Sequence, residues 1–146
     1  MIIDRTGDIL DSEFNCIVNT VNCVGVMGKG IALKIKNIMP DRYFETYKNN
    51  CKNGLYKPGG VYFYEDSETN IINFTTKDHW RNPSKKEWII SGLNDFVIKY
   101  PHWNIDEIAF PMLGCGCGGL DQNEIYDIMY KKLEPLKDLK IEIWKY

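Results

Sequence analysis

The sequence predicts an α/β protein, built as a three-layer α/β/α structure around a mixed, mostly parallel sheet with helices on both faces. Short β-branched segments alternate with amphipathic helical segments, which is typical of parallel strands joined by helical crossovers. Glycine-rich loops follow two of the predicted strands. The length of 146 residues fits one domain, so we expect residues 1–146 to fold as a single unit.

The first half of the chain contains β-branched segments and two helical segments. Cys16–Val21 (CIVNTV) is β-branched and bounded by polar residues, which is typical of a buried strand. Apolar side chains then recur with helical spacing at Ile31, Ile35, Ile38 and Met39, until Pro40 ends the helix. The other expected elements are a short apolar opening at Ile2–Asp4, a helix from Asp41 towards Cys51, and strands at Val61–Glu65 and Asn70–Phe74 around a polar turn at Asp66–Thr69.

The second half repeats the alternation of helix and strand. The segment Ser84–Glu87 (SKKE) has the form of a capping box, in which the serine accepts a hydrogen bond from the N3 amide. Asp121 and Glu124 are expected to begin a later helix that stops near Pro135. The remaining expected features are a helical stripe at Ile89, Leu93, Phe96, Val97 and Tyr100, a strand at Ile105–Phe110, apolar helix positions at Ile125, Ile128, Met129 and Leu133, and a strand at Lys140–Trp144.

Composition narrows the class of protein. The 18 Lys and Arg against 20 Asp and Glu give a net charge of −2, without a polybasic run. This disfavours a protein that grips a nucleic-acid backbone by charge alone. No apolar run or signal peptide indicates a membrane or export. The odd count of five cysteines favours reduced thiols in the cytoplasm, and the spacing of Cys115 and Cys117 without a second close pair disfavours a metal site.

Two glycine loops provide the first functional signal. Gly25–Gly30 (GVMGKG) and Pro111–Gly119 (PMLGCGCGG) each follow a predicted strand and precede a predicted helix. Ligands of parallel sheets bind where strands end and helices begin, and glycine lets backbone amides approach an anion there. Two such loops at one sheet edge suit a diphosphate. The alternative is that each loop is only a tight turn.

Two familiar phosphate-binding motifs are not satisfied. A Walker A loop would need a hydroxyl residue after Lys29 and a glycine at Cys23, and it has neither. The spacing of Gly114, Gly116 and Gly119 does match the dinucleotide fingerprint. That motif also needs an acidic residue on a following strand of a longer fold, and too little chain remains after Gly119. A nucleotide-triphosphatase and a dehydrogenase are therefore both disfavoured.

Four polar side chains are candidates at the same edge, each with a structural alternative. Asn19 and Asn22 could bind ribose hydroxyls or form turns. Asp8 could accept from an adenine amine or cap a helix. Lys77 follows a predicted strand and could attack a sugar carbon, although most such lysines are solvated surface groups.

Four segments together resemble the macro domain family. They are GDIL, VNTVNCVGVMGKGIA, INFTTKDHWR and PMLGCGCGGLD, and in this order they span essentially the whole chain. The resemblance is to the DarG-type branch, whose members remove ADP-ribose from thymidine in DNA. It implies a hydrolase that binds ADP-ribose, requires no cofactor or metal, and belongs to an antitoxin-like system whose toxin the sequence does not identify.

The resemblance implies roles for individual residues. Lys77 is expected to be catalytic, attacking or polarising the distal ribose at C1″. The expected ADP-ribose contacts are Asp8 and Ile9 at the adenine, Asn22 at the distal ribose, Gly28, Lys29, Gly30 and Ile31 around the distal ribose and diphosphate, and Gly114, Cys115, Gly116, Cys117, Gly118, Gly119 and Leu120 at the phosphates. Asn19 and Thr76 are also expected to contact the ligand.

One departure bears on the acceptor. The related human terminal ADP-ribose protein glycohydrolase has an acidic residue where this chain has Gly118, and Asp121 is expected only to cap a helix. The resemblance therefore makes single-stranded DNA the leading ADP-ribosylated substrate, and we expect its flanking strand to be held weakly or by a local patch near Lys77, His79 and Arg81. The alternatives are ADP-ribosylated protein, O-acetyl-ADP-ribose, or a reader that binds ADP-ribose without turnover.

Overall fold

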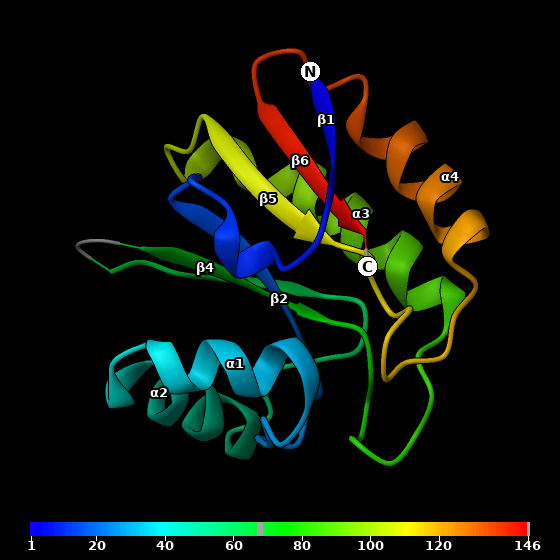
Figure 1. The fold of residues 1–146 in the computed structure, drawn as a ribbon. Helices are drawn as coiled ribbons and strands as arrows, with labels where there is room; N and C mark the ends of the chain where they lie inside the picture. Colours follow the sequence, from blue (N-terminus) through cyan, green and yellow to red (C-terminus); the bar gives the residue numbers. More distant parts are fainter. Residues whose placement is uncertain (67–68, 146) are drawn as a thin grey trace.

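The computed structural model describes residues 1–66 and 69–145, and it forms one six-stranded sheet covered by four α-helices (Figure 1). The elements in chain order are β1 (Ile2–Thr6), η1 (Ile9–Asp11), β2 (Cys16–Val21), α1 (Gly30–Ile38), α2 (Asp41–Lys52), β3 (Val61–Tyr64), β4 (Asn70–Thr75), α3 (Lys86–Lys99), η2 (Tyr100–His102), β5 (Glu107–Pro111), α4 (Gln122–Leu133) and β6 (Lys140–Lys145).

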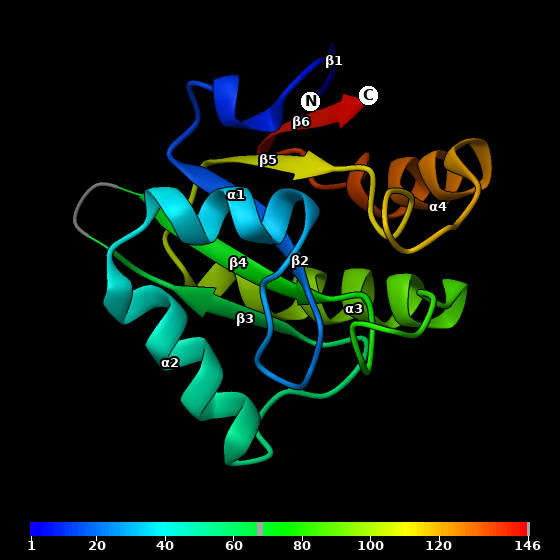
Figure 2. The same ribbon diagram turned by 60° about the horizontal axis from the view of Figure 1, so that its bottom comes forward.

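The sheet has the order β1-β6-β5-β2-β4-β3. Every pairing is parallel except β3 with β4, which are joined as a hairpin. Helices α1 and α2 cover one face, and α3 and α4 cover the other (Figures 1 and 2). The predicted three-layer, mostly parallel architecture is therefore confirmed.

Two apolar cores lie on opposite faces of the sheet. Alternate residues of β2 point to opposite sides, so Val18 joins the core under α3 and α4, and Ile17 joins the core under α1 and α2. On the face covered by α3 and α4, α3 lies close to the sheet at Gly92. A Cβ there would stand 2.3 Å from ring atoms of Phe74, so only glycine permits this approach.

Most expected elements are confirmed, and the differences concern single residues. Ile38 was expected on the buried stripe of α1, but it is 61% exposed, and Ala32 packs inward instead. The buried face of α1 is centred on Ala32 and Ile35, and position 38 lies about 120° from Ala32 around the helix axis, so Ile38 points to solvent. The turn expected at Asp66–Thr69 includes residues 67 and 68, which lie outside the described residues.

The capping box predicted at Ser84 is wrong. Helix α3 begins at Lys86, its N-cap is Lys85, and no side chain caps it. Ser84 stands one residue too early to reach the N3 amide, and it is buried elsewhere. In contrast, Asp121 caps α4 as expected, because its carboxylate accepts from the amide of Glu124 at 2.9 Å.

A buried carboxylate fastens the start of the chain to the sheet. Glu142 in β6 accepts hydrogen bonds from Arg5 Nε at 3.0 Å, Ser12 Oγ at 2.5 Å and Trp144 Nε1 at 3.0 Å. These bonds hold the segment around η1 against β6, and this segment carries Asp8 and Ile9. Among the described residues, no helix is both long and apolar enough to cross a membrane.

Candidate functional site

The candidate site lies at one edge of the sheet. Five of the six strands run parallel, so their carboxyl ends meet at this edge, and Val21 of β2 is in register with Thr75 of β4. Four loops leave it, at residues 7–8 after β1, 22–29 after β2, 76–85 after β4 and 112–121 after β5. Most of the predicted site residues lie in these loops.

Asn22 organises the first glycine loop. Its Nδ2 donates to the carbonyl oxygen of Val26 at 2.8 Å, and its Oδ1 accepts from the amide of Val24 at 3.1 Å. The hydroxyl of Tyr47 in α2 donates to the same Oδ1 at 2.9 Å. Asn22 is buried, so its side chain shapes the loop from beneath. Sequence reasoning missed Tyr47, because nothing in the sequence places its hydroxyl under residue 22.

The end of the first loop meets the second loop at Gly30. Residues Gly28, Lys29 and Gly30 are exposed, and Ile31 is half-buried at the start of α1. No side chain caps this helix, so its first amides remain available to an anion. Gly30 has a φ of +58°, and a Cβ there would stand 3.5 Å from Cys117 Sγ. The two predicted phosphate loops therefore lie side by side at this point.

Hydrogen bonds between main-chain groups close the second loop. The amide of Leu120 donates to the carbonyl of Gly114 at 2.9 Å, and the amide of Gly119 donates to that of Gly116 at 3.3 Å. Gly114 and Gly119 have φ values of +73° and +78°, which favour glycine. Cys115 is half-buried within this loop.

Ser84 packs directly beneath the second loop. Its amide donates to the carbonyl of Gly118 at 3.1 Å, and its buried hydroxyl has no hydrogen-bond partner among the described residues. A Cβ at Gly118 would stand 2.3 Å from Ser84 Oγ and 2.4 Å from the carbonyl oxygen of Gly114. This arrangement has no room for any side chain at position 118. Sequence reasoning assigned Ser84 to a helix cap and missed this role.

Lys77 lies between the two loops. Its Nζ donates to the carbonyl oxygens of Cys117 at 3.0 Å and Trp80 at 3.5 Å. On the other side, Cys23 Sγ lies 3.5 Å from the carbonyl oxygen of Lys77. Thr76, just before it, is buried, and its amide donates to the carbonyl of Val21 at 3.0 Å. The structure thus brings Lys77, Thr76 and both glycine loops together.

Asp8 and Ile9 follow β1 at the same edge. The Asp8 carboxylate accepts from the amide of Leu10 at 3.0 Å and caps the short helix η1, which is the structural alternative given above. It also pairs with Lys34 of α1 at 3.5 Å. Asp8 is exposed and Ile9 is buried. Capping uses Oδ1 and the ion pair uses Oδ2, so Asp8 faces solvent beside α1.

Asn19 is not brought together with the other candidates. It lies inside β2, is completely buried, and its Nδ2 donates to the hydroxyl of Tyr43 at 2.9 Å. That hydroxyl in turn donates to Asn73 Oδ1 at 2.5 Å. The turn-forming alternative is wrong, because Asn19 belongs to a strand. Its side chain takes part in a buried polar network under α2.

The thiols near the site resist ionisation. Burial raises the pKa of Cys23 to about 12 and that of Cys115 to about 11, with neighbouring negative groups adding to both shifts. Both stay protonated at neutral pH and fit the expected packing role. Cys117 is exposed. Within residues 1–66 and 69–145, no cluster of three or more His, Cys, Asp or Glu side chains could hold a metal ion.

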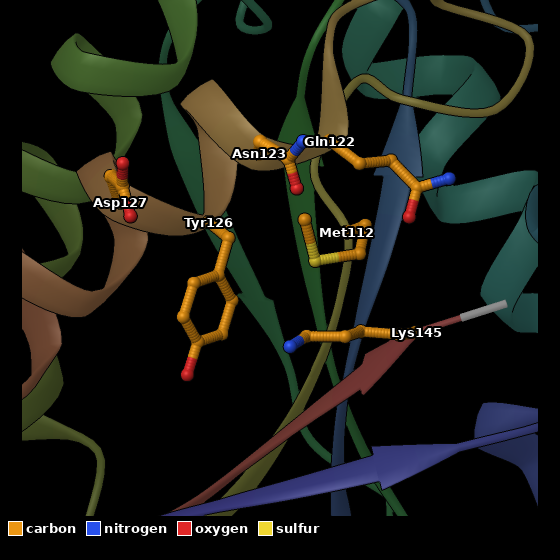
Figure 3. Close-up of a pocket in the computed structure, with 6 residues that line it drawn as sticks. All are labelled: Met112, Gln122, Asn123, Tyr126, Asp127 and Lys145. Atoms are coloured by element: carbon orange, nitrogen blue, oxygen red, sulfur yellow. The ribbon is translucent and has the colours of Figure 1, made fainter.

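A small cavity of about 140 Å³ lies beside the amino end of α4 (Figure 3). There the Tyr126 hydroxyl donates to the Asp4 carboxylate at 2.9 Å, and Lys145 Nζ lies 3.9 Å from the centre of the Tyr126 ring. Tyr126 thus contacts both a carboxylate and an ammonium group beside this cavity. The lining residues are Met112, Gln122, Asn123, Tyr126, Asp127 and Lys145, and none was predicted as a site residue.

Fold and site define the class of protein: a three-layer α/β/α domain in which two glycine loops meet over a lysine at the carboxyl edge of the sheet. The model of the Macro domain family matches residues 18–129. This chain belongs to the macro domain family.

Several relatives are similar over nearly the whole chain. The DNA ADP-ribosyl glycohydrolase of Thermus aquaticus is 39% identical over 144 residues, and that of Mycobacterium tuberculosis is 40% identical over 148 residues. The alignments cover 96% and 99% of this chain, but 39% and 42% of those proteins. The chain thus spans about two fifths of the length of the curated relatives it matches.

Solved structures agree. The macrodomain of Mycobacterium tuberculosis DarG superposes with a TM-score of 0.94 at 40% identity, covering 99% of this chain and 97% of that one. Thermosipho africanus DarTG in complex with ADP-ribose superposes with a TM-score of 0.87 at 32% identity, covering 97% of this chain and 42% of that one.

Proposed function

We propose that this chain binds ADP-ribose and hydrolyses the bond that joins it to a thymidine base in single-stranded DNA. The names of the relatives support the activity, since proteins 39% and 40% identical to this chain are called DNA ADP-ribosyl glycohydrolases. The structure of Thermosipho africanus DarTG in complex with ADP-ribose, 32% identical to this chain, supports the ligand. The site geometry supports both, as follows.

The observation that carries the proposal is the position of Lys77. Its amine lies 3.0 Å from the carbonyl oxygen of Cys117 in the second loop, and its backbone contacts Cys23 of the first loop. A diphosphate held between the two loops would leave its attached sugar beside this amine. A lysine in that position can act on the anomeric carbon.

We expect ADP-ribose to lie across the site in one direction. The uncapped start of α1 and the amides of the second loop suit the diphosphate, because both offer N–H groups and a partial positive charge. The adenine then extends towards Asp8 and Ile9 beyond β1. The distal ribose extends towards Asn22, Thr76 and Lys77. In this orientation C1″ of the distal ribose is the atom nearest the lysine.

The reaction proceeds by displacement at C1″. As a proton leaves Nζ of Lys77, the nitrogen lone pair attacks C1″ and a carbon–nitrogen bond forms, while the glycosidic bond breaks with its electron pair moving to the base. The base takes up the proton that the amine loses. Water then replaces the lysine at C1″, which restores the amine and releases ADP-ribose. Orientation by the two loops supplies the alignment that this step needs.

The packing around Gly118 favours DNA as the acceptor over protein. An acidic residue at this loop position is the feature of the protein-directed relative described above. Here Ser84 and Gly114 occupy the space that a side chain at 118 would need. The chain therefore has to act without a carboxylate in this loop, and Asp121 is engaged in capping α4.

A single-turnover assay tests the proposal. The substrate is a single-stranded oligonucleotide with one ADP-ribosylated thymidine, and the product is free ADP-ribose measured by chromatography. We expect release by the wild-type chain and a loss of at least about 100-fold in Lys77→Ala, because covalent catalysis is removed. Lys131→Ala, which removes an exposed lysine of α4, is the matched control and should release ADP-ribose at a rate close to that of the wild type.

Three outcomes contradict the proposal in different ways. Equal rates for wild type and Lys77→Ala would exclude the lysine. Binding of ADP-ribose without release from any substrate would indicate a reader. Release only from an ADP-ribosylated protein or from O-acetyl-ADP-ribose would move the activity to another acceptor, so both substrates belong in the same panel.

We further propose that the chain works in the cytoplasm against a DNA-modifying transferase. The relative from Thermosipho africanus is named a DNA ADP-ribosyl transferase fused to a DNA ADP-ribosyl glycohydrolase, which supports such a partner. All five cysteines are free thiols, which suits a reducing compartment. Co-purification of the chain with a transferase expressed in the same cells tests the pairing.

A further inference from the structure

The loop after Lys77 is held in one conformation by its own side chains. The Asp78 carboxylate accepts from the amide of His79 at 2.7 Å and from Asn82 Nδ2 at 3.1 Å. The amide of Arg81 donates to His79 Nδ1 at 3.1 Å. The hydrogen bond from Asn82 is the main reason that the pKa of Asp78 is lowered. These bonds fix the direction in which Trp80 leaves the loop.

Trp80 stands open to solvent at the end of this loop. Its side chain is 45% exposed, although indole is among the largest apolar groups. The guanidinium carbon of Arg81 lies 4.7 Å from the centre of the indole ring, and the imidazole of His79 lies 5.2 Å away. A cation and a second ring thus support the indole without burying it. We call Trp80 and Arg81 the Trp80 platform.

The Trp80 platform adjoins the proposed reaction centre. The carbonyl oxygen of Trp80 lies 3.5 Å from Lys77 Nζ, so the indole leaves the backbone at the point where that amine is bound. Positive groups gather here in a chain of net charge −2, since Lys77, Arg81 and Lys85 lie within nine positions and Asp78 is engaged inside the loop. An anionic strand that brings a modified nucleotide to Lys77 would pass this surface.

We propose that the Trp80 platform binds the DNA next to the ADP-ribosylated thymidine: the indole of Trp80 stacks on the neighbouring nucleobase, and Arg81 faces the adjoining phosphate. The inference rests on the proposed function and names the part of the DNA that this site recognises outside ADP-ribose. Stacking on indole is tolerant of sequence, because every base offers a flat face. It also replaces the long basic surface that the composition lacks, since a single stacked base can fix the strand.

The experiment pairs a change in the protein with a change in the DNA. Two oligonucleotides each carry one ADP-ribosylated thymidine, flanked in one by ordinary nucleotides and in the other by abasic sites. We expect the wild type to prefer the substrate with ordinary flanking nucleotides over the one with abasic flanks. The preference should be about 5- to 100-fold in kcat/KM, the range that one stacked base provides. Trp80→Ala should lose this preference, and Trp80→Phe should keep most of it.

Matched controls separate stacking from general damage. Tyr130 of α4 is an aromatic residue of nearly equal exposure, 44%, and Tyr130→Ala should keep the full preference. The affinity for free ADP-ribose should be the same in Trp80→Ala and wild type, because that ligand has no flanking base. Arg81→Ala should weaken DNA turnover most at low salt, where phosphate contacts are strongest.

Each remaining outcome overturns the inference or the proposed function, but not both together. Equal preference in wild type and Trp80→Ala overturns the platform. If Trp80→Ala loses as much kcat/KM on an ADP-ribosylated peptide as on DNA, the proposal is also overturned, since the surface would then serve a protein substrate. If the wild type releases no ADP-ribose from DNA, the proposed function fails. In that case, binding of a labelled unmodified oligonucleotide, measured by fluorescence anisotropy, tests the stacking proposal by itself. The proposal is overturned if Trp80→Ala binds this oligonucleotide as tightly as the wild type does.

Discussion

The amine of Lys77 donates to the main-chain oxygen of Cys117 at 3.0 Å and so joins the loop after β4 to the loop after β5. The two residues are 40 positions apart in the chain, and only the parallel pairing of the strands brings them together. The contact places the candidate nucleophile against the loop that would hold its substrate's phosphates. It also means that the amine must leave this carbonyl to reach a sugar.

Lys77→Ala should separate binding from turnover. The amine contacts only main-chain oxygens of its own protein among the described residues, so free ADP-ribose should bind the variant within about threefold of wild type, because a single exposed hydrogen bond contributes little. Isothermal titration calorimetry with free ADP-ribose measures this. A loss of more than about tenfold, equal to about 1.4 kcal/mol, would show that Lys77 clamps the ligand.

Gly118→Ala should damage the second loop. Its new Cβ would meet Ser84 Oγ at 2.3 Å and the Gly114 carbonyl at 2.4 Å, so the loop backbone has to shift. We expect a destabilisation of about 1–3 kcal/mol and weaker ADP-ribose binding. Gly54→Ala is the control, because Gly54 has a φ of +75° with open space around it. It should lose about 1–2 kcal/mol from backbone strain alone and bind normally.

Cys117 should be the thiol that reports on the ligand. It is exposed, whereas burial raises the pKa of Cys23 to about 12 and that of Cys115 to about 11. Iodoacetamide at pH 8 should therefore modify Cys117 first, and bound ADP-ribose should slow the reaction by covering the loop. Peptide mass spectrometry over a time course measures both rates. If ADP-ribose leaves the rate at Cys117 unchanged, this loop is not part of the binding site.

The Glu142 carboxylate should make the free energy of unfolding depend on pH in the acid range. Burial alone would raise its pKa, but hydrogen bonds from Ser12, Trp144 and Arg5 outweigh burial and hold the pKa below 4.5. A carboxyl whose pKa is lowered by folding stabilises the protein above its unfolded pKa, and this contribution is lost as the pH falls through the folded value. Denaturation by urea between pH 7 and pH 3 should show this loss.

Glu142→Gln should then be less stable at pH 7 by roughly 2 kcal/mol and lose less stability in acid. Glu134→Gln is the control, because Glu134 pairs with Lys137 at the surface of the protein. That variant should follow the wild-type pH profile. A profile for Glu142→Gln that parallels wild type would place the acid sensitivity elsewhere.

The secondary structure was largely predictable because it depends on local patterns. Cys16–Val21 is a strand with the predicted bounds, since a β-branched run between polar residues is consistent with little else. Ser84 shows the limit of such reasoning. Its neighbours matched a capping box, but packing against Gly118 decided its position, and no local pattern describes a contact between residues 34 positions apart.

The candidate site divides in the same way. Glycine spacing pointed to the loops. The position of Lys77 after a strand by itself favoured a solvated surface lysine, and the resemblance to the macro domain family singled it out. Asn19 could not be placed from its motif, because Asn22, three positions later, has the same side chain. The end of β2 at Val21 puts Asn19 in the core and Asn22 in the loop, and the motif does not show where the strand ends. Tyr47 gained its significance from a contact between α2 and the loop after β2, and Trp80 gained its significance from its exposure beside Lys77.

The sequence by itself determined the alternation of strands and helices, the two glycine loops and the family, because these follow from residue type and spacing along the chain. The tertiary structure decided which groups meet: Lys77 with Cys117, Gly118 with Ser84, and Asn22 with Tyr47. These contacts depend on strand order and on the distance between packed elements. Distances of a few ångströms between remote residues are set by the whole fold, and no local pattern contains them.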